Sequence, residues 1–296
     1  METIRRKLFA LLGGILLIAL FSGVSLFLGR EKREGIVVSG KDCEGEILAE
    51  ILAQYIEQRL AIPVKRSARV DGTFLTFEAL KGKEIDLYVE YTGTALTAIL
   101  GEEVQGRSCI EIYEAVKKGL LKWDIQVLSP LGFQNRYALI MDPAVAKAHG
   151  IETLSDLRLK GGNLRVGFDQ EFCGREEFEI LKRDYNLSFP RLQMMDHVLL
   201  YLALERKGCD LINGYSTDGF CRNLKLLEDD QGKLPSYEAV PIIRREVLER
   251  YENLEEVINQ LAGTISSEAM QEMNYQVEKK GVSIYNAAKT FLENHL

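Results

Sequence analysis

From residue 36 onward, short runs of consecutive apolar residues alternate with longer stretches in which apolar residues recur every three or four positions. The run at 36–38 is typical of a buried strand, whereas the spacing of apolar residues over 45–60 predicts a helix. The pattern predicts further strands at 63–70, 85–88, 137–141, 164–168, 192–195 and 210–213. It predicts further helices at 73–80, 94–100, 110–121, 178–185 and 198–206, and a short helix that Pro143 opens.

The end of the chain lacks this alternation. From Arg245 onward the pattern is helical throughout, at 247–251, 254–261, 267–280 and 283–294. Strands that alternate with helices are typical of an α/β fold with mainly parallel sheet. Because the chain beyond residue 35 is long for one such sheet, we expect two α/β lobes, with the C-terminal helices packed on the earlier one.

The first 34 residues have a different character. Arg5, Arg6 and Lys7 precede an uncharged apolar run from Leu8 to Gly29, which is long enough to span a bilayer as a helix. Basic residues before such a run are typical of a secretory signal, although no small-x-small cleavage site follows. We expect export either way, with residues 1–34 as a signal peptide or as an uncleaved membrane anchor.

Composition and motifs exclude several other classes of protein. The net charge of −7 argues against a nucleic-acid partner, which usually requires a basic surface. The three histidines and five cysteines show no metal-ligand spacing, and no P-loop or G-x-G-x-x-G motif is present. The segment GYSTDG at 214–219 fails the spacing of a nucleophile elbow. We therefore expect no metal, no cofactor and no catalysis.

An ordered set of segments carries a resemblance to a known family. Together they resemble the substrate-binding proteins of ABC transporters for glycine betaine, carnitine and choline, from about residue 36 to the C-terminus. The segments are GTF at 72–74, FEAL at 77–80, IDLYVEYTGT at 85–94, PLGFQNRYAL at 130–139, GFDQEF at 167–172, YSTDG at 215–219, LEDD at 227–230 and NYQV at 274–277.

The resemblance implies a type II periplasmic-binding-protein fold, in which two α/β lobes hold a ligand in the cleft between them. It implies that lobe 1 comprises residues 35–138 plus 243–296 and that lobe 2 comprises residues 139–242. The second lobe would thus be inserted into the first, which would return the C-terminal helices to lobe 1.

The resemblance also implies a ligand site. The family holds a trimethylammonium group in a box of tyrosines, and the matching positions are Tyr91, Tyr137, Tyr215 and Tyr237. Such a cation has no N–H to donate, so aromatic faces are well suited to select it. Arg175 matches the family's carboxylate-binding arginine, and its alternative role is a surface ion pair with Glu176 or Glu177. Thr94, where a strand end meets a helix start, is a further candidate to bind the carboxylate. Asn135 is a further polar residue that we expect to line the cleft.

One departure from the family pattern concerns the start of the first long helix. Where the family places a glutamine that reaches the cleft, this chain has Glu46 in the run CEGE at 43–46. A carboxylate there would support a cation or repel a ligand carboxylate, and Glu46 is therefore a further candidate site residue.

These patterns predict an extracytoplasmic receptor that passes a quaternary-ammonium osmolyte, such as glycine betaine, proline betaine, carnitine or choline, to an ABC permease and its ATPase. Its location would be the periplasm or the outer face of the membrane, with the N-terminal segment as an anchor if it is uncleaved. The alternative is a ligand-sensing module of a membrane signalling system with the same fold.

Overall fold

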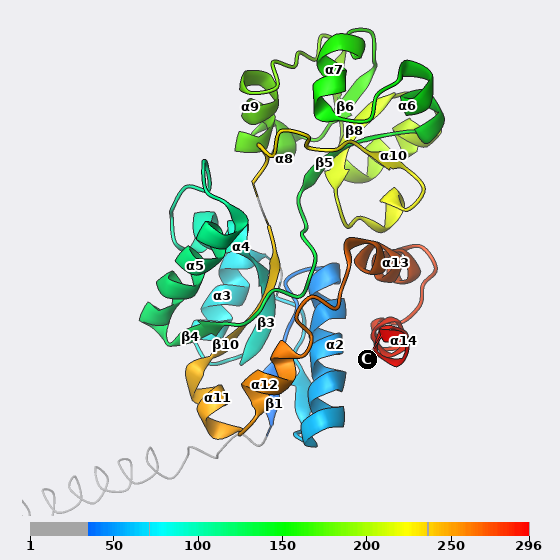
Figure 1. The fold of residues 1–296 in the computed structure, drawn as a ribbon. Coiled ribbons are helices and arrows are strands. Elements are labelled where there is room, and N and C mark those ends of the chain that lie inside the picture. Colours follow the sequence, from blue (N-terminus) through cyan, green and yellow to red (C-terminus); the bar gives the residue numbers. More distant parts are fainter. Residues whose placement is uncertain (1–34, 71, 236, 296) are drawn as a thin grey trace, which may run out of the picture.

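Two five-stranded sheets form the centres of two lobes in the computed structural model, which describes residues 35–70, 72–235 and 237–295 (Figure 1). The predicted signal or anchor at 1–34 lies outside this part of the chain. Among the described residues no helix is both long and apolar enough to cross a membrane.

The first sheet has the order β2-β1-β3-β10-β4. Helices lie on both of its faces, and each face has its own apolar core. The first-sheet elements and their covering helices are β1 (Ile36–Val38), α2 (Cys43–Leu60), β2 (Val64–Arg66), α3 (Thr73–Lys81), β3 (Leu87–Tyr91), α4 (Thr92–Thr94), the π-helical turn η1 (Ala95–Ile99), α5 (Cys109–Leu120), η2 (Leu121–Trp123), β4 (Ile125–Val127) and β10 (Ala239–Arg244).

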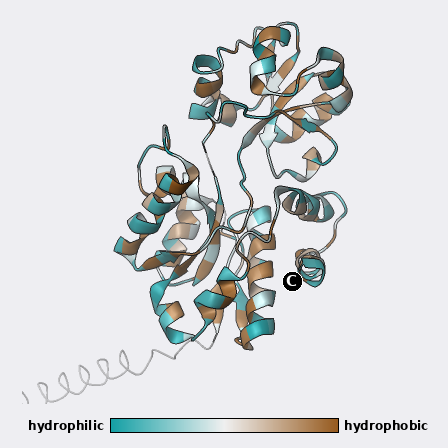
Figure 2. Ribbon diagram, viewed as in Figure 1, coloured by the Kyte–Doolittle hydropathy of each residue, from teal (hydrophilic) through white to brown (hydrophobic). Residues whose placement is uncertain are grey.

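The second sheet has the order β7-β6-β8-β5-β9, and it also carries an apolar core on each face. In Figure 2 the strands of both sheets are mostly hydrophobic, while α9 and α13 show hydrophilic residues toward solvent. The elements are β5 (Tyr137–Met141), α6 (Pro143–His149), α7 (Leu154–Lys160), β6 (Val166–Phe168), α8 (Gln170–Cys173), α9 (Glu176–Arg183), β7 (Leu192–Met194), α10 (His197–Glu205), β8 (Leu211–Tyr215), η3 (Gly219–Cys221) and β9 (Lys225–Leu226).

Both sheets are mixed, so the expectation of mainly parallel sheet was wrong. β1 runs parallel to β2 and β3, but β10 runs antiparallel to both β3 and β4. In the second sheet β5 runs antiparallel to β8 and β9. The physical reason is that β5 and β10 are the strands by which the chain enters the second lobe and returns from it, and neither is part of a β-α-β crossover.

The C-terminal helices pack on the first lobe, as predicted, and the last three of them contact α2. They are α11 (Arg245–Arg250), α12 (Leu254–Asn259), α13 (Ser267–Glu278) and α14 (Ile284–His295), and Figure 1 shows α14 and α13 beside α2. α13 also contacts η3 of the second lobe. Gly219 allows this approach, because a Cβ there would lie 2.6 Å from the backbone nitrogen of Tyr275. The lobe boundaries at residues 138 and 242 stay a prediction.

Candidate functional site

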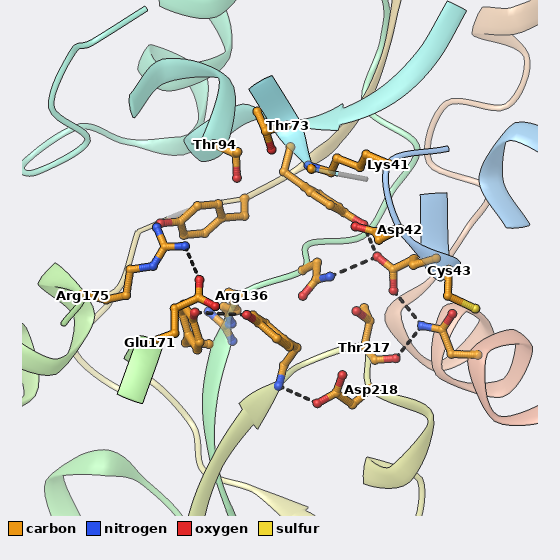
Figure 3. Close-up of a pocket in the computed structure, with 18 of the residues that line it drawn as sticks. Lys41, Asp42, Cys43, Thr73, Thr94, Arg136, Glu171, Arg175, Thr217 and Asp218 are labelled. Atoms are coloured by element: carbon orange, nitrogen blue, oxygen red, sulfur yellow. Dashed lines mark hydrogen bonds and ion pairs between the residues drawn. The ribbon is translucent and has the colours of Figure 1, made fainter. Parts of the chain in front are cut away.

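A cavity of about 520 Å³ lies where the two lobes face each other. Its volume is within the range of roughly 300–1,000 Å³ that is typical of small-molecule sites. Its lining comes from both lobes and from α13 (Figure 3). The lining residues are Lys41, Asp42, Cys43, Glu44, Gly72, Thr73, Tyr91, Thr94, Asn135, Arg136, Tyr137, Glu171, Arg175, Tyr215, Thr217, Asp218, Tyr237, Asn274 and Glu278.

The structure brings seven of the eight predicted site residues together in this one cavity. They are Tyr91, Thr94, Asn135, Tyr137, Arg175, Tyr215 and Tyr237. Glu46 is not among the lining residues. Their positions in the fold agree with the predicted site, but the role of each residue stays a proposal.

Strand ends explain how the tyrosines gather. Tyr91 is the last residue of β3, Tyr137 is the first of β5 and Tyr215 is the last of β8. Because β5 and β8 are antiparallel, Tyr137 lies directly opposite Tyr215, with ring centroids 4.7 Å apart and hydroxyls 3.0 Å apart. Tyr237 precedes β10, whose first residue, Ala239, pairs with Tyr91.

The tyrosine rings are neutral phenols. Burial raises the pKa of Tyr215 to about 12, and burial raises the pKa of Tyr91, Tyr137 and Tyr237 well above the usual range. The site therefore presents uncharged aromatic faces, which attract a cation through the ring quadrupole.

Two cation–π contacts already exist within the site, one between Lys41 and Tyr91 and one between Arg175 and Tyr137. The ammonium of Lys41 lies 4.5 Å from the ring centroid of Tyr91 and forms a buried ion pair with Glu90. Lys41 thus occupies one face of Tyr91, so only the other face of that ring is available to a ligand.

Arg175 stands immediately before α9 and lines one side of the cavity, next to Glu171 in Figure 3. Its Nη2 donates a 2.5 Å hydrogen bond to the Glu171 carboxylate, and its guanidinium lies 5.9 Å from the ring centroid of Tyr137. The ion-pair partner of Arg175 is therefore Glu171. It is not Glu176 or Glu177, which the alternative interpretation expected. A guanidinium carries five N–H donors, so Arg175 keeps several for a ligand carboxylate.

Thr94 and Asn135 both line the cavity. Thr94 lies in the α4 turn directly after β3, where a strand end meets the start of a helix. Asn135 lies in the segment that leads from the first lobe to β5, where its backbone nitrogen donates to the Tyr237 carbonyl at 3.1 Å.

Glu44, and not Glu46, is the acidic residue that α2 directs into the cavity. α2 begins at Cys43 with Asp42 as its N-cap, and residues two positions apart on a helix point in nearly opposite directions. Glu46 consequently lies on the outer side, 3.4 Å from Arg69 and 32% exposed. Glu46, the predicted site residue, therefore does not line the cavity, and the glutamate of this helix that does is Glu44.

The Glu44 carboxylate is held by three donors from three parts of the chain. It accepts hydrogen bonds from the Tyr91 hydroxyl, from Asn135 Nδ2 at 3.1 Å and from Asn274 Nδ2 at 2.7 Å. Burial raises the pKa of Glu44 to about 7, although these hydrogen bonds oppose the shift. Glu44 is therefore an acidic group that titrates near neutral pH.

A second buried network lies behind Tyr215. His197 bonds to Asp169 at 3.2 Å and to Asp218 at 3.1 Å, and its ring lies 5.3 Å from that of Tyr215. Burial alone would lower the pKa of His197, but the bonds to Asp218 and Asp169 raise it to about 9. At neutral pH an imidazolium thus links the loops after β6 and β8.

The charges of the cavity are distributed unevenly. Figure 3 shows Arg175 and Glu171 on one side and Cys43, Thr217 and Asp218 on the other. Asn274 bridges Glu44 to the Thr217 carbonyl, so Glu44 belongs to the second side. Among the described lining residues the carboxyl groups outnumber the basic groups, which favours a ligand with a cationic part: Asp42, Glu44, Glu171, Asp218 and Glu278 against Lys41, Arg136 and Arg175.

Sequence reasoning missed several lining residues. Lys41 and Asp42 precede a helix, and Asn274 and Glu278 lie on a distant C-terminal helix, so no local pattern connects them. Glu44 did carry a signal, because it stands three and four residues before the buried Ile47 and Leu48 and thus shares their helix face.

The two α/β lobes, each built on a mixed sheet, and the cavity between them define a periplasmic binding protein of type II. The family described as the substrate binding domain of ABC-type glycine betaine transport systems matches residues 35–294, and the chain belongs to it. Its members are extracytoplasmic binding proteins of transporters rather than enzymes, and the comparisons give no support to the signalling alternative.

Individual relatives agree with this assignment. The carnitine transport binding protein OpuCC of Listeria monocytogenes is 32% identical over 297 residues, covering 94% of this chain and 96% of that one. The ergothioneine transport permease/ergothioneine binding protein EgtU of Helicobacter pylori is 34% identical over 268 residues, covering 89% of this chain. This chain spans about half of that relative, 48%.

A solved structure shares the fold closely. The crystal structure of a glycine betaine/carnitine/choline ABC transporter protein superposes with a TM-score of 0.83 and 30% identity, covering 88% of this chain and 98% of that chain.

Proposed function

We propose that this protein captures a zwitterionic trimethylammonium compound outside the cytoplasm and delivers it to an ABC permease with its ATPase. The observation that carries the proposal is the gathering of four tyrosines and Arg175, from distant parts of the chain, in one cavity between the lobes. The relatives named for betaine, carnitine and ergothioneine binding support the same ligand class, because these compounds share a trimethylammonium group and a carboxylate.

The trimethylammonium group of such a compound matches the tyrosines of the site, and its carboxylate matches Arg175. A trimethylammonium group gains about 0.5–2 kcal/mol from each aromatic face, so several faces together supply a substantial share of the binding free energy. Arg175 supplies a charge-assisted contact for the carboxylate. Binding of a zwitterion is thereby favoured over the pure cation choline.

Calorimetric titration with glycine betaine, carnitine and choline tests this proposal. Tyr215→Ala should weaken binding of the zwitterions at least about tenfold, because one aromatic face is lost. Tyr285→Ala is the matched control, since Tyr285 is 54% exposed on α14 and does not line the cavity. If both variants bind like the unaltered protein, the tyrosines do not form the cage.

The role of Arg175 has its own test. Arg175→Ala should weaken glycine betaine about tenfold or more while leaving choline nearly unchanged, because only the betaine has a carboxylate. Arg183→Ala is the control, since Arg183 lies at the end of the same helix, is similarly exposed and pairs with Glu176 and Asp184. Equal losses for both ligands would make Arg175 a structural residue.

A further inference from the structure

Besides the two chain crossovers, the lobes are joined by a contact between α13 of the first lobe and the segment after β8 of the second. Among the described helices and strands, α13 and η3 form the most extensive contact between the lobes. A Cβ on Gly219 would lie 2.6 Å from the backbone nitrogen of Tyr275 and 2.8 Å from the carbonyl carbon of Asn274. The two main chains therefore touch at Gly219, with no side chain between them.

Two hydrogen bonds from α13 to consecutive main-chain carbonyls strengthen this contact. Gln271 Nε2 donates to the Ser216 carbonyl and Asn274 Nδ2 donates to the Thr217 carbonyl, each at 2.7 Å. Asn274 is 3% exposed, and its amide also donates to Glu44 of the first lobe at 2.7 Å. Separating the lobes at this point would leave buried polar groups without these hydrogen bonds, which is unfavourable.

Charged side chains at the edge of the contact join the same two segments. Arg222 forms a 2.9 Å ion pair with Glu272, and the Lys279 ammonium lies 3.8 Å from the ring centroid of Phe220. Partly exposed pairs of this kind are individually weak. They add to the close approach of the main chains and to the two hydrogen bonds, which are the stronger part of the contact.

Ser216 links this contact to the crossover that leads from the first lobe to β5. Its Oγ donates to the Gln134 carbonyl at 3.0 Å and accepts from the Arg136 backbone nitrogen at 3.0 Å. Its own backbone nitrogen donates to the Arg136 carbonyl at 2.8 Å. The contact with α13 therefore lies directly beside the crossover, where a hinge between the lobes has to be.

The other side of the cavity has no such connection. Figure 3 shows Arg175 on one side of the cavity, near Thr94, and Thr217 and Asp218 on the other. Arg175 belongs to the second lobe and Thr94 to the first, and no hydrogen bond or ion pair among the described residues joins the two. The lobes are thus bonded to each other on the Thr217 side and can move apart or together on the Arg175 side.

We propose that the contact between α13 and residues 216–222, which we call the pivot, stays formed while the lobes close on a ligand, so that closure brings Arg175 toward Thr94. Two crossovers alone would let the lobes twist as well as bend, and a third contact beside them restricts the motion. The ligand then enters on the Arg175 side, and the Thr217 side is a fixed wall of the cavity. This inference rests on the proposed function, since a bound ligand drives the closure.

Distances between pairs of spin labels, with and without saturating glycine betaine or carnitine, test the pivot. The labels are coupled to introduced ketone-bearing residues, so the five native cysteines stay unaltered. One pair, at the exposed positions Asn223 and Lys280, spans the pivot. The other pair, at Glu103 before α5 and Lys182 on α9, spans the side away from α13 (Figure 1).

The ligand should shorten the distance between Glu103 and Lys182 by more than about 2 Å and change the distance between Asn223 and Lys280 by less than that. The inference is overturned if the second distance changes as much as the first, or if neither changes although calorimetry shows that the ligand binds. If calorimetry shows no binding of either compound, the proposed function fails instead.

Variants of the pivot test it without a ligand, and therefore independently of the proposed function. Gly219→Ala adds a Cβ that meets the Tyr275 backbone, so α13 has to move away from η3. Gly162→Ala is the matched control, since it makes the same change in the second lobe where no atom lies within 4 Å. Gln271→Ala, which only removes a hydrogen bond, is a second variant in case Gly219→Ala does not fold.

The distribution of distances between Glu103 and Lys182 in the ligand-free protein is the measurement. It should be broader in Gly219→Ala and, to a smaller extent, in Gln271→Ala, because the lobes lose their third connection. It should be unchanged in Gly162→Ala. Distributions as narrow in both pivot variants as in the control would mean that the contact does not guide the lobes, and would overturn the inference.

Discussion

Two regions of the molecule place an ionisable side chain behind a tyrosine of the cavity, and they differ in how completely its hydrogen bonds are used. Behind Tyr215, His197 lies between Asp169 and Asp218, and both ring nitrogens are bonded. Behind Tyr91, Glu44 accepts hydrogen bonds from two amide groups whose oxygens have no hydrogen-bond partner among the described residues. The His197 network therefore uses both ring nitrogens, whereas the Glu44 network leaves two amide oxygens unpaired among the residues that the structure describes.

The two networks also differ in the acidic group at their centre. Asp218 Oδ2 alone accepts from the Tyr215 backbone nitrogen at 2.9 Å, from the Tyr201 hydroxyl at 2.5 Å and from His197. These hydrogen bonds hold the loop after β8 in position behind the Tyr215 ring. Glu44 is instead a buried carboxyl whose pKa is raised by burial to about 7.

The largest expected effect on stability comes from disrupting the His197 network. Asp218→Ala removes the acceptor of three hydrogen bonds and leaves the partly exposed imidazolium of His197 with one carboxylate partner, so we expect a loss of about 4 kcal/mol in the free energy of unfolding. Denaturant unfolding measures it, with Glu179→Ala, an exposed ion-pair partner of Lys182, as a control that changes less than about 1 kcal/mol. A loss no larger than that of the control would mean that the network does not hold the loop after β8.

The next largest expected effect is the pH dependence that Glu44 gives to the free energy of unfolding. A carboxyl whose pKa rises from 4.5 in the unfolded chain to about 7 in the folded protein is most favourable to stability below pH 4.5. That contribution is lost as the pH rises through about 7, and the total loss is at most about 3 kcal/mol. The unfolding free energy of the unaltered protein relative to that of Glu44→Gln should therefore be highest below pH 4.5 and should fall as the pH rises through about 7. A pH-independent difference between the two proteins would contradict it.

A smaller effect is expected for His197, because this ring is 32% exposed and solvent screens its charge. Its pKa rises from 6.5 to about 9, so its contribution to stability is complete below pH 6.5 and is lost as the pH rises through about 9. Asp169, Asp218 and Glu278 are the acidic groups that favour the protonated form. His197→Gln should remove this alkaline decline in a thermal-unfolding series, and an unchanged decline would assign it to other groups.

Much of this arrangement could be predicted from the sequence, for reasons visible in particular residues. The apolar periodicity of α2 and the apolar run of β5 matched the predicted elements, and the ordered motifs pointed to residues that meet in the cavity. The choice between Glu44 and Glu46 was within reach as well, because the buried positions Ile47 and Leu48 set the phase of the helix.

Other features depend on tertiary pairing that no local pattern reveals. β10 contains Pro241, which weakened the strand signal, yet it is buried in the middle of the first sheet between β3 and β4. Its antiparallel direction makes the sheet mixed, and it follows from the return of the chain rather than from residue type. Asn274 reaches Glu44 across 230 positions of sequence, so only the folded chain identifies it as a site residue.

The central claim is that the tyrosine cage recognises positive charge and not merely shape. Titration calorimetry with 4-trimethylammoniobutanoate and its carbon isostere 5,5-dimethylhexanoate, which keeps the carboxylate but has no positive charge, tests it most directly, since the two differ only in the central atom of the trimethyl group. We predict that the betaine binds at least about thirtyfold more tightly, because several aromatic faces each favour the cation. Equal affinity for the two compounds would contradict the account and would reduce the cage to an apolar pocket.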